Sequence, residues 1–156
     1  MQIISDEEFN RFSISSVDFE KALQFANEAK KHPANNLVYE ALLFAAIVSY
    51  YRPFSPNERE PDAEATKKLT LEQFPTLTDS EREIHDMCKA LRNEALAHSE
   101  WRRNPTRFNR DTGVVASRPF SLFSPSFDLD GFIQLAEKLR LACERSRGDY
   151  VIRNRT

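Results

Sequence analysis

The chain has 156 residues, of which 40% are hydrophobic and 29% charged, a composition typical of one soluble globular domain. It has only 3 glycines and contains neither GxGxxG nor GxxxxGK[ST], which disfavours turn-rich β architectures and phosphate-cradling nucleotide sites. The net charge of -2 hides an asymmetry, because residues 1–100 carry 11 Lys+Arg against 18 Asp+Glu (-7), whereas residues 101–156 carry 11 against 6 (+5), which indicates an anionic partner for the basic part.

The first predicted helix follows a short lead-in, which we expect to occupy residues 1–14. It runs from Ser16 to about Lys31, with Ser15 or Ser16 as its cap and Pro33 just past its end. Its apolar residues recur at helical spacing and predict one buried face, made of Phe19, Ala22, Leu23, Ala26 and Ala29.

The second predicted helix is the most apolar part of the chain. It covers Leu37–Tyr51, begins at a cap provided by Asn35 or Asn36, and is stopped by the prolines at 53 and 56. Apolar residues occupy nearly all of its faces. Since a helix that is hydrophobic all round is buried among others, we expect it to be the central helix of a bundle.

A long proline-rich connection, residues 53–78, separates this helix from the third and has room for a short helix at 62–72. The third helix is predicted over residues 79–101. Its capping box would use Thr78 with Glu81 or Ser80 with Glu83. A seam with the spacing of a helix bundle follows, consisting of Ile84, Cys88, Leu91, Ala95 and His98.

Residues 102–127 break the helical pattern. The sequence Asp111-Thr112-Gly113 lies between short mixed runs, which favours a small hairpin or an ordered loop at about 105–125. The last helix is predicted from about Asp128 to Arg147, with residues 151–156 frayed. Its buried face would consist of Leu129, Phe132, Leu135, Ala136, Leu139 and Cys143.

Four substantial helices in one small chain predict an all-α, antiparallel up-and-down bundle of four to five helices, forming a single domain over residues 1–156. Cys88 and Cys143 are too few for a disulfide framework and are expected to be buried, reduced thiols. The N-terminal residues lack the pattern of a signal peptide, and the longest apolar run is shorter than the roughly 20 residues of a membrane span. We therefore expect a soluble, cytoplasmic protein.

The most informative segment is LRNEALAHSEW, residues 91–101, which carries Arg92, Asn93 and His98 on one predicted helix. It resembles the RX4–6H motif of the HEPN superfamily, in which a polar residue, often Asn, follows the Arg. The apolar helix ending in YYRPF and the proline-rich connection before the motif helix also resemble that family. The resemblance implies a metal-independent endoribonuclease or RNA-binding toxin or defence protein. It also implies a homodimer with a composite site and, in some members, an antitoxin or nucleotidyltransferase partner.

The two motif side chains suit RNA cleavage chemically. Arg92 keeps its charge and offers a planar fork that fits a phosphate, and His98 can take up or return a proton near neutral pH. On an α-helix they would lie about 120° and roughly 9 Å apart, so convergence on one phosphate is easier if a second chain contributes. Asn93 points further from the seam and would serve as a hydrogen-bonding support.

Two residues near the motif bear on its chemistry. In family members regulated by a nucleotidyltransferase, the Arg–His gap is four and a Tyr follows the His two positions later. Here the gap is five and Glu100 occupies that place, so modification of this kind is not expected. Glu94, one turn before the His, would either orient its ring or be a solvated carboxylate.

An arginine-rich segment follows the motif, with Trp101 and Phe108 interleaved, and contains Arg102, Arg103, Arg107, Arg110 and Arg118. Since arginines contact phosphates and aromatic rings stack on unpaired bases, it would form an RNA-binding surface. Alternatively, its positive charges pair with the acidic first part of the chain, within one molecule or across a dimer. His85 and Cys88 lack a matching second pair, so no metal site and no cofactor are predicted.

Purely structural roles for the motif residues also stay open. His98 could be a satisfied core residue, and Arg92 could pair with a carboxylate of a neighbouring helix. The chain would then be a non-catalytic helical bundle that binds a nucleotide, an RNA or a partner protein, or a plain structural module.

Overall fold

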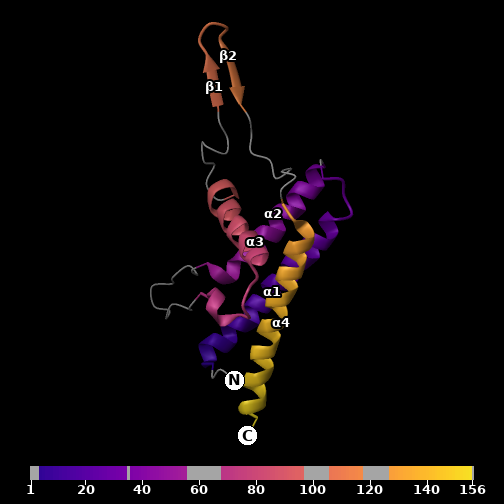
Figure 1. The fold of residues 1–156 in the computed structure, drawn as a ribbon, viewed down its shortest axis with the longest axis vertical. Helices are drawn as coiled ribbons and strands as arrows, with labels where there is room; N and C mark the ends of the chain where they lie inside the picture. Colours follow the sequence, from indigo (N-terminus) through magenta and orange to yellow (C-terminus); the bar gives the residue numbers. More distant parts are fainter. Residues whose placement is uncertain (1–3, 35, 56–67, 97–105, 118–126, 156) are drawn as a thin grey trace.

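The computed structural model describes residues 4–34, 36–55, 68–96, 106–117 and 127–155, which form an all-α bundle with a small β-hairpin (Figure 1). Its long helices run up, down, up and down, and confirm the predicted antiparallel bundle. They are α1 (Asp6–Ala29), α2 (Leu37–Tyr51), α3 (Asp79–Ala90) and α4 (Leu129–Arg153). Short helical turns form η1 (Arg52–Phe54), η2 (Leu71–Gln73) and η3 (Leu91–Leu96), and the strands are β1 (Thr106–Asn109) and β2 (Val114–Ser117).

Helix α1 begins ten residues earlier than predicted, so the expected lead-in over residues 1–14 is wrong. Ser5 and Glu8 form a capping box in which the Ser5 hydroxyl accepts from the Glu8 amide at 3.2 Å and the Glu8 carboxylate accepts from the Ser5 amide at 2.9 Å. The added turns bury Phe12, whose ring packs edge-on against Phe74. The five apolar residues predicted for this helix are all buried.

Helix α2 has the predicted bounds, and its cap is Asn36, whose side-chain oxygen accepts from the Val38 amide at 2.7 Å. The expectation that it lies at the centre of the bundle is wrong. It buries one side, including Leu43 and Ile47, and leaves Leu37 77% exposed. The central helix is instead α1, which packs against both α2 and α4.

The connection to α3 is anchored where the Leu69 amide donates to the Pro53 carbonyl at 2.9 Å. The short helix predicted at 62–72 lies largely outside the described residues, of which 71–73 form the single turn η2. Helix α3 begins with the predicted capping box of Thr78 and Glu81. Along its seam Ile84 and Cys88 are buried and Leu91 is half-buried, whereas the side chain of Ala95 and all of His98 lie outside what the structure describes.

Helix α4 is capped by Asp128, whose carboxylate accepts from the Gly131 amide at 2.9 Å. It continues to Arg153, so the predicted end at Arg147 and the fraying of 151–153 are wrong. The reason is the early start of α1, because the Tyr150 ring stacks on Phe9 at 4.4 Å and its hydroxyl donates to Asp6 at 2.5 Å. The predicted apolar face is buried, with Leu129 half-buried.

The β-hairpin lies at the predicted place and extends beyond the end of the bundle where η3 ends (Figure 1). Thr106 pairs with Ser117 and Asn109 with Val114. Its turn depends on Gly113, which has φ +68° and donates its amide to the Asn109 carbonyl at 2.9 Å. Asn109 also accepts from the Asp111 amide at 2.9 Å through its side chain.

The core is rich in aromatic rings at the junction of α1, α2 and α4. Tyr50 lies at its centre, with its ring 5.7 Å from that of Phe19 and 5.2 Å from that of Phe132. Both cysteines are free and buried, as predicted. Among the described residues, no helix combines the length and the apolar character needed to cross a bilayer.

Candidate functional site

Arg92 and Asn93 lie in η3, which continues α3 as a wider, π-type helical turn. Turns of this kind are rare and occur often at functional sites. Leu91 holds the turn in place by packing against the hydrophobic core. The wider turn changes the angle between successive side chains, whereas the predicted separation of about 120° between Arg92 and His98 assumes an α-helix. His98 lies outside the described residues, so that separation stays a prediction.

Arg92 is half-buried, and its Nη1 donates to the side-chain oxygen of Asn93 at 2.8 Å. No ion pair joins it to a carboxylate in the part of the chain that the structure describes, so the alternative partner on a neighbouring helix is not found there. Asn93, the member of the motif expected to point furthest away, is thus the direct support of the guanidinium.

Tyr51, at the end of α2, interacts electrostatically with Arg92. Burial raises the pKa of Tyr51, the positive charge of Arg92 opposes this, and Asp86 adds to the rise. The phenol therefore stays protonated around neutral pH, within electrostatic range of the guanidinium. Sequence reasoning treated Tyr51 as mostly core, because its relation to Arg92 depends on how two helices pack.

Sequence reasoning considers His85 only as a metal pair with Cys88 and misses its contact with Tyr51. It is only 5% exposed, and its Nδ1 lies 2.9 Å from the Tyr50 hydroxyl in a buried hydrogen bond. Its ring packs against Phe54 at 4.8 Å and Tyr51 at 5.6 Å. A signal was present, since seven residues separate His85 from Arg92 and seven residues bring an α-helix back to almost the same side.

The surroundings of His85 keep its imidazole neutral. Burial lowers the pKa of His85, Asp86 opposes that shift, and Lys89 and Arg82 add to the lowering. Burial also raises the pKa of the Cys88 thiol far above its usual range. No group of three or more metal-ligating side chains is found within the described ranges.

A test of pH dependence follows from the buried imidazole. Because the folded-state pKa of His85 is lowered, its contribution to stability is full above about pH 6.5, the unfolded value. It is lost as the pH falls from there through the folded-state pKa, since the unfolded chain then binds the extra proton. We expect the free energy of unfolding by urea to decline between pH 7.5 and 5.5. His85→Gln should be less stable at pH 7.5 and decline less, and equal slopes in both proteins would contradict the prediction.

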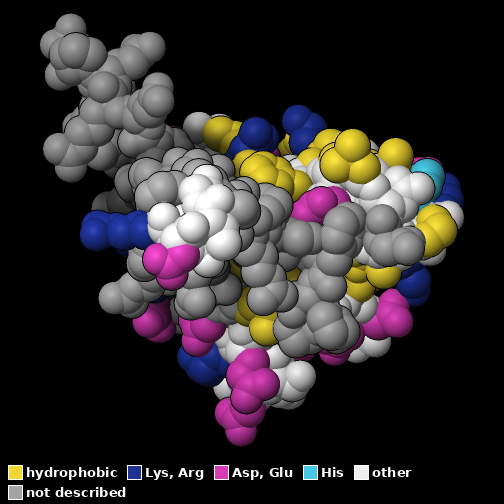
Figure 2. Space-filling view, turned by 90° about the horizontal axis from the view of Figure 1, so that it is seen from above, with side chains coloured by type: hydrophobic (Ala, Val, Ile, Leu, Met, Phe, Trp, Pro, Cys, Tyr) yellow, Lys and Arg dark blue, Asp and Glu magenta, His cyan; other side chains and the backbone are white. Residues whose placement is uncertain are grey.

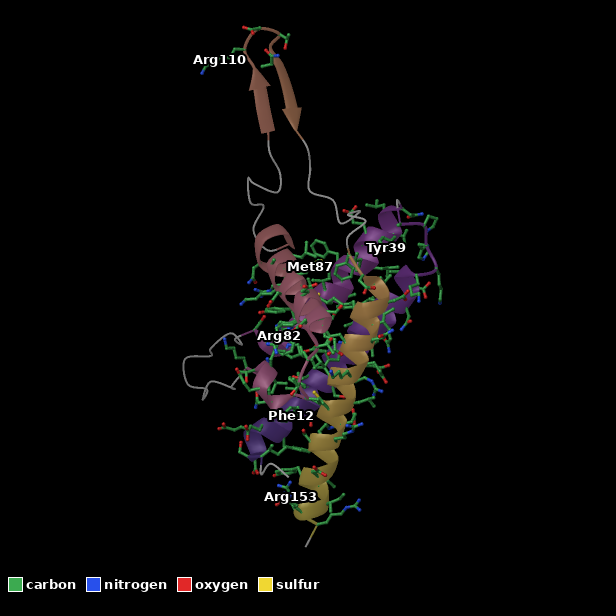
Figure 3. The ribbon with its side chains drawn as sticks, viewed as in Figure 1. Phe12, Tyr39, Arg82, Met87, Arg110 and Arg153 are labelled. Atoms are coloured by element: carbon green, nitrogen blue, oxygen red, sulfur yellow. The ribbon has the colours of Figure 1, made fainter. Side chains whose placement is uncertain are left out.

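The arginine-rich segment is described only in part. Arg110 is exposed at the tip of the hairpin, away from the helices (Figure 3). Arg107 belongs to β1 but its side chain lies outside the description, as do Arg102, Arg103 and His98 entirely. In contrast, Arg82 of α3 is exposed on the bundle itself (Figure 3).

Comparisons with protein-family models, curated proteins and solved structures find no match to this chain. The resemblance to the HEPN superfamily therefore depends on the residues of the motif and on the helical architecture around it. What the structure adds is an arginine hydrogen-bonded to an amide neighbour, within electrostatic range of a protonated phenol, at the end of a bundle helix.

Proposed function

We propose that this chain is a HEPN-like, metal-independent endoribonuclease that acts as a cytoplasmic homodimer through Arg92, Asn93 and His98. The observation that carries the proposal is the state of Arg92. Its guanidinium is half-buried in a π-type turn and bonded to an amide oxygen, with no carboxylate paired to it among the described side chains. An arginine in that state keeps donors and charge for a phosphate.

The reaction would be an internal transfer at one phosphate. His98 takes the proton of an RNA 2′-hydroxyl, whose oxygen then attacks the neighbouring phosphorus. The bond from phosphorus to the 5′-oxygen breaks, that oxygen gains a proton from an imidazolium, and a 2′,3′-cyclic phosphate and a 5′-hydroxyl end remain. Arg92 stabilises the charge that builds up on the phosphate oxygens.

The second protomer would complete the site and the RNA surface. Arg102, Arg103, Arg107 and Arg110 supply positive charge for the RNA backbone, and Arg110 lies exposed at the hairpin tip. Such an activity fits a toxin or defence protein whose partner is an antitoxin or a nucleotidyltransferase.

Cleavage of a labelled single-stranded RNA in EDTA tests the proposal. We expect the wild type to cleave and to leave 2′,3′-cyclic phosphate ends, and His98→Ala to lose cleavage. His32→Ala, at a histidine just past the end of α1, is the control and should cleave like the wild type. Equal cleavage by the wild type and His98→Ala, or no cleavage by either, would rule out the catalytic role. RNA binding without cleavage would instead support a non-catalytic RNA-binding bundle.

A further inference from the structure

Helix α2 carries a continuous apolar surface that the bundle leaves uncovered. It consists of Leu37, Ala41, Phe44 and Val48, here called the α2 stripe. Leu37 is 77% and Phe44 is 40% exposed, Ala41 is also exposed, and Val48 is half-buried. Their spacing of four, three and four residues places them on one side of the helix, in the pattern of a coiled-coil seam.

The stripe lies beside the side that α2 buries in its own bundle, which includes Leu43, Ile47 and Tyr50. Looking down on the end of the bundle where α2 begins, Figure 2 shows hydrophobic side chains at the surface. The other large exposed apolar residues of the described chain are Val38, beside the stripe on α2, and short groups on α1 and α4, namely Ile14, Val17, Leu141, Val151 and Ile152. Scattered residues of that kind are normal, whereas a stripe along three turns indicates a contact surface.

We propose that the α2 stripe binds the α2 stripe of a second copy of this chain, with the two helices antiparallel and a twofold axis passing between Leu42 and Leu43. In that register Leu37 faces Val48 of the other copy, and Ala41 faces Phe44 of the other copy. Each phenyl ring then lies over the small Ala41 side chain. None of the four stripe residues is charged, so the seam itself contains no charge.

We choose a second copy of the chain as the partner because the stripe is complementary to itself. A twofold contact requires one surface to fit itself, and the order large, small, large, medium along the stripe does so when the direction is reversed. In a parallel pair, Phe44 would face Phe44 and Ala41 would face Ala41, which leaves one layer crowded and the next one empty. The antiparallel arrangement therefore fills the interface evenly.

This inference deepens the proposed function by naming the surface of the dimer, but its observations concern α2 alone. The turn η3, with Arg92 and Asn93, also packs against α2. Pairing through α2 would thus bring two copies of the motif segment into one assembly. The oligomeric state can be measured without RNA, so its failure and the failure of the nuclease proposal are distinguishable.

The first experiment is light scattering coupled to size-exclusion chromatography on the full chain. We expect twice the chain mass of 18.1 kDa for the wild type, and a dissociation constant raised roughly a hundredfold or more for Phe44→Glu, because each interface would bury two charges. Leu141→Glu is the matched control, since Leu141 is also 40% exposed, and should remain dimeric. A monomeric wild type, or a Phe44→Glu dimer as tight as the wild type, overturns the proposal. Circular dichroism of both variants verifies that the bundle stays folded.

Disulfide crosslinking tests the register, and it stays informative if Phe44→Glu misfolds. In the double variant Leu37→Cys/Val48→Cys, two disulfides should join the copies, because each new thiol faces its counterpart on the other chain. Leu37→Cys alone should not crosslink, since the two copies of residue 37 are roughly 16 Å apart along the helix axis, beyond the reach of a disulfide. Crosslinking of Leu37→Cys alone, or none in the double variant, overturns the antiparallel pairing. The native thiols are buried and do not compete.

Discussion

Replacing Arg92 by lysine is expected to reduce the rate of RNA cleavage by about 10²–10³-fold while leaving the helix content unchanged. Lysine keeps the positive charge but loses the planar fork, so it cannot bind Asn93 and two phosphate oxygens in the same fixed geometry. Single-turnover cleavage measures the loss, and saturating RNA separates a slower chemical step from weaker binding.

Two further variants separate this role from general electrostatics. Arg82→Lys, on the exposed surface of α3, should cleave like the wild type. Asn93→Ala should lower the rate by less than Arg92→Lys, because it removes the support of the guanidinium and not the guanidinium itself. If Arg92→Lys lowers the melting temperature but cleaves normally, Arg92 has a structural role and the nuclease site lies elsewhere.

The sequence predicted those elements whose signals are local. The bounds of α2 follow from an Asn cap and two prolines, α3 begins at a capping box, and the hairpin turn depends on Gly113. Of the two large errors in helix bounds, the one at the end of α4 concerns a residue whose partner is distant in the chain, whereas the start of α1 has a local capping box of Ser5 and Glu8. The early turns of α1 read as polar, and the late turns of α4 are held by Tyr150 against Phe9, a contact across 141 residues.

The residues of the candidate site also divide into those with a local signal in the sequence and those placed by packing. The motif residues could be located from their spacing, but the π-type turn that pairs Arg92 with Asn93 could not, because spacing arguments assume a regular α-helix. Tyr51 belongs to another helix, so its electrostatic interaction with Arg92 is a result of packing. The exposed side of α2 was missed for a related reason, since a helix that is apolar all round is equally compatible with a buried position and with an intermolecular one.

The residue expected to contribute most to the position of this site is Arg11 of α1, which is only 4% exposed. Its Nη2 donates to three carbonyls just after α2, those of Arg52 at 3.1 Å, Pro53 at 2.7 Å and Ser55 at 3.3 Å. The Arg52 and Pro53 carbonyls also accept from the Ser55 and Leu69 amides, so the guanidinium adds a charged donor to a segment that is already hydrogen-bonded. The same short segment carries Phe54, whose ring contacts His85. Arg11 thereby fixes the end of α2 against α3.

Replacing Arg11 by methionine should therefore lower the free energy of unfolding by about 2–4 kcal/mol, because the volume is nearly kept while the buried carbonyls lose a charged donor. Urea unfolding measures the loss, and Arg82→Met, at an exposed arginine, should change stability by less than about 0.5 kcal/mol. A loss for Arg11→Met as small as that of the control would show that the carbonyls find other partners. A large loss together with normal cleavage by the remaining folded protein would show that Arg92 keeps its position without the clamp on α2, and would separate the stability of the bundle from the geometry of the site.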